Sequence, residues 1–276
     1  MKKTKRIILL AVGLFFLFTA SGFPEIIQEQ RKDVYTEPNT YLWEFDTSLS
    51  YSTGDFGTPT TTNTLYWPLT IRRFFKDADI AFTFPFIYQK SGPGIAAISG
   101  HPFQISNNTN GREETHGGIG DLLLNGRYYV FNESTQAFTL STIGQIKFPT
   151  ANDNDGLGTG EFDETIGLES SKNFDQLWSG YLNLYYTFIG EPPGRELDNE
   201  FTFSIGVGYQ IRPSTQATLF YRESTALVDD QDNPRTVSLG LNHKLTNETM
   251  IYGSTGFGVS EGSPDVILSL GASYLF

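Results

Sequence analysis

The feature that most constrains the fold of this chain is a two-residue alternation of apolar and polar side chains, clearest in its last eleven residues. Successive side chains of a β-strand point to opposite faces, so the alternation predicts a strand with one apolar face. An alternating strand that ends on an aromatic residue is typical of the closing strand of an outer-membrane β-barrel. The apolar parity consists of Val266, Leu268, Leu270, Ala272, Tyr274 and Phe276.

The first 22 residues have the composition of a secretory signal peptide. Four basic residues precede an apolar run over residues 7–18, and we expect cleavage after Gly22. No other long apolar run follows, and the mean hydropathy is -0.26. Because lipid offers no water to pair with free backbone groups, a chain without apolar helices can span a membrane only as a closed barrel. We expect the mature chain to reside in the outer membrane of a Gram-negative bacterium.

Composition and charge agree with a barrel and exclude some partners. The chain contains 14 Tyr, 23 Phe and 28 Gly, which suit interfacial aromatic girdles and tightly curved strands, and it contains no Cys. Removal of the signal peptide takes away four of the 19 basic residues, so that 15 remain against 31 acidic ones, a net charge of -16. This acidity argues against a nucleic-acid partner. It suits a setting among outer-membrane lipid and lipopolysaccharide.

The alternation predicts an all-β fold, a transmembrane antiparallel up-and-down barrel of about twelve strands. Glu44 and Asp46 share a parity of the first strand, and two acids cannot point at lipid, so that face is assigned to the lumen. We predict one barrel domain over residues 41–276, preceded by a polar segment, residues 23–40, that could dangle in the periplasm, form a short helix or plug the lumen. The predicted strands cover residues 41–51, 65–71, 80–88, 120–131, 138–148, 163–171, 178–188, 201–211, 217–221, 237–241, 250–259 and 266–276.

Short and long connections between these strands alternate along the chain. Short turns are expected in the periplasm and long loops outside. The short connections are residues 76–77, 132–134, 173–175, 213–214 and 246–248. The long ones are residues 53–63, 90–118, 149–160, 190–199, 225–234 and 260–264.

Charged residues on the lumen parity are the first candidate functional site. Asp121, Lys147 and Asp163 fall at one level of three neighbouring strands, which predicts a ladder between them. Such a ladder could select solutes by charge, as rings of charge do in pores, or it could be a structural network that fills a narrow lumen. The full set of predicted channel-lining residues is Glu44, Asp46, Arg72, Asp121, Arg127, Lys147, Asp163, Glu169, Arg222 and Lys244.

Two prolines form the second candidate site. If residues 76–77 are a turn, the numbers of paired residues sum to 153, and Pro68 then faces Pro85. Each proline removes a donor from the strand ladder, so the pair predicts a local defect in the wall. That defect could be a lateral exit for a hydrophobic solute or a tolerated bulge, and the frequency of bulges at strand prolines favours the bulge.

The remaining motifs are less informative about function. We expect the barrel-assembly machinery to recognise the terminal strand through Tyr274 and Phe276. The acidic loop of residues 152–156 lacks the ligand spacing of an EF-hand, and we predict no metal and no cofactor. An outer-membrane hydrolase is a rival interpretation, but His243, the one strand histidine, has no serine beside it in the sequence. A structural or adhesive barrel without transport is the other alternative.

Several motifs resemble one known family. They are Gly118-Ile119-Gly120-Asp121-Leu122, Gly126-Arg127-Tyr128-Tyr129, Lys147-Phe148-Pro149-Thr150 and Gly156-Leu157-Gly158-Thr159-Gly160. Together they are similar to the phenol meta-degradation-pathway family of outer-membrane transporters, over roughly residues 41–276. The resemblance implies diffusion of a small-molecule solute, such as an aromatic or otherwise hydrophobic compound, through a porin-like channel. It implies no catalytic residue.

Overall fold

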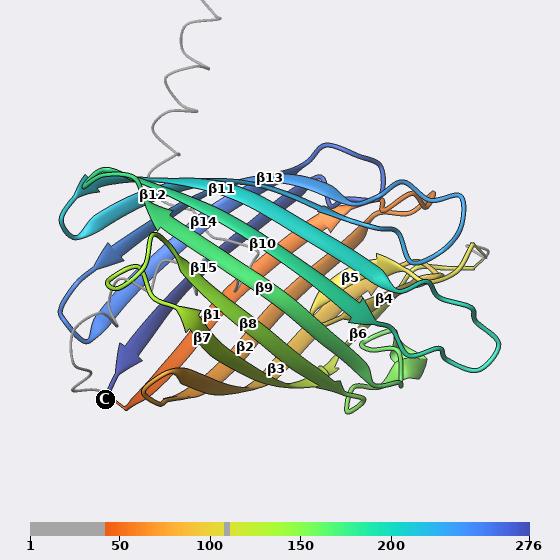
Figure 1. The fold of residues 1–276 in the computed structure, drawn as a ribbon. Coiled ribbons are helices and arrows are strands. Elements are labelled where there is room, and N and C mark those ends of the chain that lie inside the picture. Colours follow the sequence, from red (N-terminus) through yellow and green to blue (C-terminus); the bar gives the residue numbers. More distant parts are fainter. Residues whose placement is uncertain (1–41, 108–110) are drawn as a thin grey trace, which may run out of the picture.

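The computed structural model describes residues 42–107 and 111–276, and these form one closed antiparallel β-barrel (Figure 1). Twelve wall positions follow one another in chain order, and the first strand pairs with the last. The predicted fold class is therefore confirmed. The expected signal peptide, residues 1–22, the segment 23–40 and Tyr41 lie outside the described residues. In the described part of the chain no helix is long and apolar enough to cross a membrane.

The wall consists of β1 (Trp43–Gly54), β2 (Thr62–Phe74), β3 (Ala78–Ser91), β6 (Glu114–Ile119), β7 (Leu122–Phe131), β8 (Thr139–Phe148), β9 (Asp163–Asn173), β10 (Trp178–Phe188), β11 (Glu200–Arg212), β12 (Thr215–Ser224), β13 (Arg235–Lys244), β14 (Thr249–Gly258) and β15 (Val266–Leu275). Five wall strands, β2, β3, β11, β12 and β13, extend beyond the predicted ranges at both ends, and the others, except β6, lie within three residues of the predicted bounds. One wall position is shared by two strands, β6 and β7. A separate hairpin of β4 (Ile95–Ile98) and β5 (His101–Gln104) is not part of the wall sheet.

Pairing between β1 and β15 closes the barrel. Phe45 lies opposite Tyr274 and Leu49 opposite Leu270, so outward positions of the two strands match. At the seam the Trp43 amide donates to the Phe276 carbonyl at 2.9 Å, and the Phe276 amide donates to the Trp43 carbonyl at 2.9 Å. This pairing removes the two lateral edges that an open sheet would present to lipid at β1 and β15.

The two faces of the wall differ as the alternation predicts. Large apolar side chains on the outward parity are exposed, for example Leu270 at 58% and Ile205 at 55%. Inward neighbours are small or polar and buried, such as Ser269 at 2%. An apolar outer face and a polar inner face suit a barrel that contacts lipid outside and encloses a lumen.

Glycines let large inward rings lie flat against the wall. A Cβ added to Gly206 would come within 2.3 Å of the Phe220 ring, and one added to Gly271 within 2.2 Å of the Tyr252 ring. These contacts are possible only without a side chain at the glycine. These inward aromatic rings therefore lie over the backbone of neighbouring strands.

The fourth wall position corrects the sequence prediction of one continuous strand over residues 120–131. The numbers of paired residues sum to 205 where β6 pairs with β3 and to 206 where β7 pairs with β3. One extra residue therefore stands opposite Pro85, which is a β-bulge. The Gly120 amide donates to the Pro85 carbonyl at 2.9 Å. The bulge exchanges the inward and outward parities between β6 and β7, and Asp121 has the lumen parity of β7.

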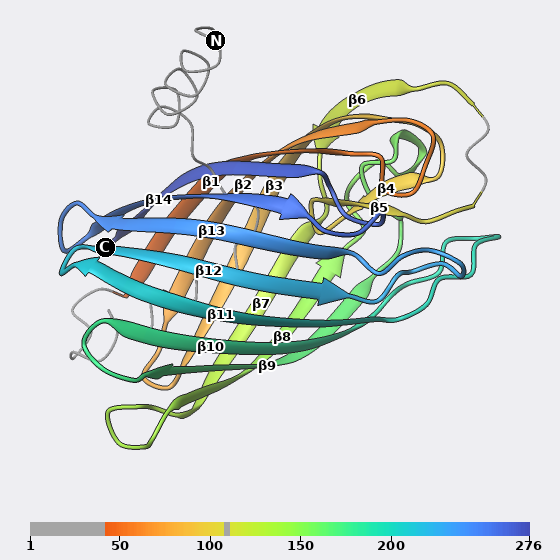
Figure 2. The same ribbon diagram turned by 90° about the horizontal axis from the view of Figure 1, so that it is seen from above.

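Short turns gather at one end of the barrel and long loops at the other (Figures 1 and 2). We call these the turn end, which also holds Phe276, and the loop end. The β4–β5 hairpin lies at the loop end. The alternation of short and long connections matches the prediction, although the turn between β7 and β8 is longer than the predicted residues 132–134.

This arrangement makes the orientation in the membrane testable. Epitope tags inserted in residues 225–234, at the loop end, should be labelled on intact cells, because long loops of such barrels face outward. Tags in residues 132–134, at the turn end, should be labelled only after the outer membrane is permeabilised. The opposite labelling pattern would invert the assigned orientation.

Candidate functional site

A cavity of about 210 Å³ lies in the lumen and is open to solvent on part of its surface. Strands from all round the barrel contribute to its lining, from Asp46 on β1 to Ile267 on β15. Eleven strand hydroxyl groups line it and can both donate and accept hydrogen bonds. They belong to Ser48, Ser50, Ser52, Thr64, Thr70, Thr83, Thr165, Thr187, Thr202, Ser224 and Thr236.

Aromatic rings interrupt this hydroxyl-rich surface. Tyr66, Tyr185 and Tyr252 reach the cavity from β2, β10 and β14, and Phe103 reaches it from β5. The Tyr252 hydroxyl donates to Asp46 at 2.8 Å. Rings beside hydroxyl groups make a surface that can contact both the apolar and the polar part of a small solute.

The β4–β5 hairpin covers the cavity at the loop end. Its turn, Ser99 and Gly100, has positive φ values of 50° and 86°, the conformation of a tight two-residue hairpin turn. His101 follows the turn, and its ring centroid lies 6.3 Å from that of Tyr66. Burial, and secondarily the positive charge of Arg222, lowers the pKa of His101 to about 4, so the imidazole is uncharged at neutral pH.

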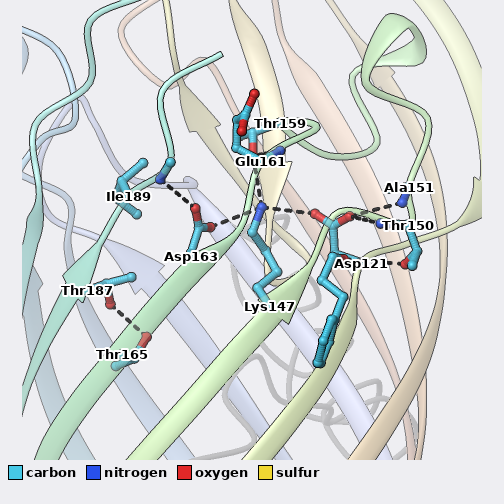
Figure 3. Close-up of polar contacts among 12 residues, drawn as sticks. Asp121, Lys147, Thr150, Ala151, Thr159, Glu161, Asp163, Thr165, Thr187 and Ile189 are labelled. Carbon is cyan, nitrogen blue, oxygen red and sulfur yellow. Dashed lines mark hydrogen bonds and ion pairs between the residues drawn. The ribbon is translucent and has the colours of Figure 1, made fainter.

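The predicted ladder is present at the loop end of the lumen (Figure 3). Lys147 Nζ lies 3.1 Å from Asp121 Oδ2 and 3.0 Å from Asp163 Oδ2, and all three side chains are buried. The ammonium group also donates to the Thr159 hydroxyl at 2.8 Å. We call these three charged residues the loop-end ladder.

The loop-end ladder also fastens the connection between β8 and β9. Asp121 Oδ1 accepts the backbone amides of Thr150 at 3.0 Å and Ala151 at 2.9 Å. Asp163 Oδ1 accepts the Gly190 amide of another loop at 3.0 Å. Each carboxylate thus holds a loop with one oxygen and Lys147 with the other, which favours the structural interpretation of the ladder.

A second buried chain of charges crosses the turn end of the lumen, and we call it the turn-end network. Arg72 Nε lies 3.4 Å from Glu44 Oε2, and the Arg72 guanidinium also pairs with Asp79. Arg127 then joins Asp79 at 3.6 Å to Glu169 at 3.0 Å. Opposite charges alternate along the network, as buried charges require.

Tyrosine hydroxyls complete the turn-end network. The Tyr129 hydroxyl donates to Asp79 Oδ2 at 2.9 Å, and the Tyr185 hydroxyl donates to Glu169 Oε1 at 2.9 Å. Tyr185 also lines the cavity, so it connects the network to the solute space.

The ten predicted channel-lining residues fall into three groups. Five line the cavity: Asp46, Arg72, Asp163, Glu169 and Arg222. Four are buried in the ladder or network without lining it: Glu44, Asp121, Arg127 and Lys147. Lys244 has the lumen parity but is exposed at the last position of β13, outside the cavity lining.

Sequence reasoning missed two lumen acids and the hairpin. Asp79 and Glu200 lie one residue before the predicted third and eighth strands, on the lumen parity, so longer strands would have included them. The β4–β5 hairpin gave a weaker signal, because its four-residue strands lie inside a long predicted loop.

The two prolines face each other as predicted, in a β2–β3 register whose sum is 153. Between β2 and β1, the pairing is interrupted beside Pro68, between Thr47 and Ser50. Between β3 and the strands β6 and β7, the bulge at Gly120 lies opposite Pro85. A bulge therefore exists at this level, in the strand next to Pro85. Pro68 lines the cavity, so the lumen reaches the wall here.

His243, the candidate histidine of the rival hydrolase, has a hydroxyl partner, but the described residues form no catalytic triad around it. His243 Nδ1 lies 2.8 Å from the Thr215 hydroxyl on the neighbouring strand. Among the described residues no carboxylate lies within ion-pair distance of His243, and no group of three or more acidic or histidine residues could hold a metal ion.

Fold and lumen together define an outer-membrane β-barrel of the channel-like kind. The family model described as "Putative MetA-pathway of phenol degradation" matches residues 34–276. The chain belongs to this family, and the match begins upstream of the predicted start at residue 41. No curated protein sequence matches the chain significantly.

Solved structures share the fold at low sequence identity. The KdgM porin has a TM-score of 0.51 at 11% identity, covering 84% of this chain and 99% of that one. The translocator domain of the autotransporter NalP from Neisseria meningitidis has a TM-score of 0.51 at 11% identity, covering 91% and 96%. The CymD monoaromatic hydrocarbon channel reaches 0.48 at 8% identity, covering 89% and 92%. The first two likenesses show the barrel fold.

The loop-end ladder predicts a specific loss of stability. Lys147→Met leaves Asp121 and Asp163 buried without their cation, which should cost about 3 kcal/mol or more. Urea unfolding in detergent would measure the loss. Lys76→Met, which removes an exposed lysine, is the control and should change stability by about 0.5 kcal/mol or less. Equal effects of the two changes would show that the ladder contributes nothing.

Proposed function

We propose that the protein is a channel through which small solutes, including aromatic compounds, diffuse across the outer membrane. The observation that carries this proposal is the lumen cavity, whose lining comes from strands all round the barrel. The family assignment supports a connection with phenol degradation. No cofactor is needed for diffusion.

The lining suits small amphipathic solutes. Hydroxyl groups can replace water around a polar substituent, and the rings of Tyr66, Tyr185 and Tyr252 can stack on an aromatic ring. Away from the Pro68/Pro85 level the backbone groups of the wall are paired between strands, so binding there would rest on side chains. Weak contacts of this kind let a solute enter and leave, as conduction requires.

Flux through purified protein in liposomes tests the proposal directly. Passage of small phenolic solutes and ions above that of protein-free liposomes would support it. Absence of both fluxes would instead favour a structural or adhesive barrel. Product release from ester or phospholipid substrates would favour the hydrolase.

The charge of the lumen predicts cation preference. Among the described residues, seven buried or cavity-lining carboxylates face four cations, a formal net charge of -3. Fixed negative charge concentrates cations, and salt screens the effect. The residues are Glu44, Asp46, Asp79, Asp121, Asp163, Glu169 and Glu200 against Arg72, Arg127, Lys147 and Arg222.

Reversal potentials across a planar bilayer under a KCl gradient would measure this preference. The potassium-to-chloride permeability ratio should exceed one and fall as the salt concentration rises. Asp46→Asn, in the cavity lining, should lower the ratio, whereas Asp77→Asn, in an exposed turn, should not. Anion preference of the unmodified protein would contradict this account of the lumen.

The proline pair supports a lateral exit as a second route for hydrophobic solutes. Here the cavity reaches a wall whose ladders lapse on both sides of the pair. The outer face at this level carries Trp67, Phe84 and Phe86, whose rings contact one another at centroid distances of 5.2–5.6 Å. A solute leaving here would pass from one aromatic surface to another.

Replacing both Pro68 and Pro85 with Thr tests this route. The change restores two donors to the strands, so it should tighten the wall and slow uptake of aromatic compounds severalfold. Ion conductance of the same variant would report whether the lumen itself is intact. Pro213→Thr, in a turn, is the matched control. Unchanged aromatic uptake with Thr at both positions would exclude the lateral exit.

A further inference from the structure

The β4–β5 hairpin stands between the cavity and the loop end of the barrel. It pairs only with itself, as a two-stranded sheet separate from the wall. Residues 98–103, which include its turn, line the cavity. A solute that enters from the loop end meets this hairpin before it reaches the hydroxyl-rich lumen.

The turn of the hairpin rests against one wall side chain. A Cβ on Gly100 would lie 2.2 Å from the Tyr66 ring, so the turn backbone is in contact with that ring. Tyr66 points inward from β2 and is buried. The ring therefore forms the seat of the hairpin turn.

Apolar contacts hold the sides of the hairpin. Ala96 and Ile98 pack in a buried cluster with Ile189, Leu197 and Leu227, which come from two other loops. Ala97 belongs to a second cluster that contains Tyr66, Ile87 and Leu157. Contacts of this kind are non-directional and can be broken and remade without leaving backbone groups unpaired.

Individual hydrogen bonds, and no shared ladder, tie the described residues of the hairpin and its stem to the loops around them. The Ala97 amide donates to the Gly156 carbonyl at 3.0 Å. Beyond β5, Gln231 Nε2 donates to Asn107 Oδ1 at 3.0 Å, and Asn107 Nδ2 donates to the Asp229 carbonyl at 3.4 Å. A wall strand of the same length would share a continuous ladder with two neighbours.

We propose that the β4–β5 hairpin is a gate, closed in this structure, that opens when its turn leaves the ring of Tyr66. This inference rests on the proposed channel function and adds how access to the cavity is controlled. Wall strands stay in place as the gate opens, because the hairpin shares no ladder with them. An element that packs against the wall without sharing its ladder can open locally while the wall stays folded.

The first test removes the Tyr66 ring, which the hairpin turn contacts. Tyr66→Ala removes the ring, so the open fraction in single-channel recordings should rise on the order of tenfold, the equivalent of ~1.4 kcal/mol. Tyr88→Ala, which removes an outward-facing tyrosine of the neighbouring strand, is the matched control and should leave the open fraction unchanged.

A reversible cross-link is the second test. The natural chain has no Cys, so Asn107→Cys with Gln231→Cys adds the only thiols, and a short bis-thiosulfonate reagent can join them. The joined protein should pass at least tenfold less solute than its reduced form. Tyr51→Cys with Asn63→Cys, a hydrogen-bonded outward pair of β1 and β2, is the control cross-link and should have no effect.

Combining the changes separates a gate from a wider pore. Cross-linking the Tyr66→Ala variant should return it to low flux if the hairpin is the gate. High flux in the cross-linked variant would mean that the lost ring merely widened the lumen, and the gate would be rejected. Equal flux before and after cross-linking of the otherwise unmodified protein would reject it too. If all reduced forms pass neither ions nor solute, the channel function itself fails.

Discussion

Backbone pairing between β1 and β15 is the constraint on which the rest of the structure depends. An unclosed sheet would expose two rows of unpaired backbone groups, each costing several kcal/mol in lipid. The fixed β1–β15 register also brings side chains from the two ends of the sequence together in the lumen. Tyr252 reaches Asp46 only because β15 lies between their strands in this register.

The lumen shows how a barrel interior can be polar without being unstable. Eight charged residues are grouped into the loop-end ladder and the turn-end network, where cations separate carboxylates. The rest of the cavity lining is mainly hydroxyl and aromatic surface together with the charged residues Asp46, Glu200 and Arg222. Paired charges are therefore concentrated in one group at the loop end and one at the turn end of the lumen.

Alternation and turn chemistry were enough to predict the barrel, because side-chain parity is fixed by contact with lipid. The register around the turn at residues 76–77 even placed Pro68 opposite Pro85. Parity could not reveal the bulge at Gly120, because residues 114–119 before it contain no clear alternation whose phase could be compared with that of β7. The β4–β5 hairpin was equally hidden, since its burial depends on Ile189, Leu197 and Leu227, which lie far away in the sequence.

The order of strands in the ladder has a consequence for how charge enters the membrane. Asp121 precedes β7, Lys147 is on β8 and Asp163 begins β9, so consecutive segments of the chain can neutralise one another before the rest of the wall is in place. The hydrogen bond between Tyr252 and Asp46 spans the seam and must wait for the two ends of the sequence to meet. The ion pairs of the ladder would then form early in barrel insertion, within neighbouring hairpins, and the contact across the seam would form last, when the barrel closes.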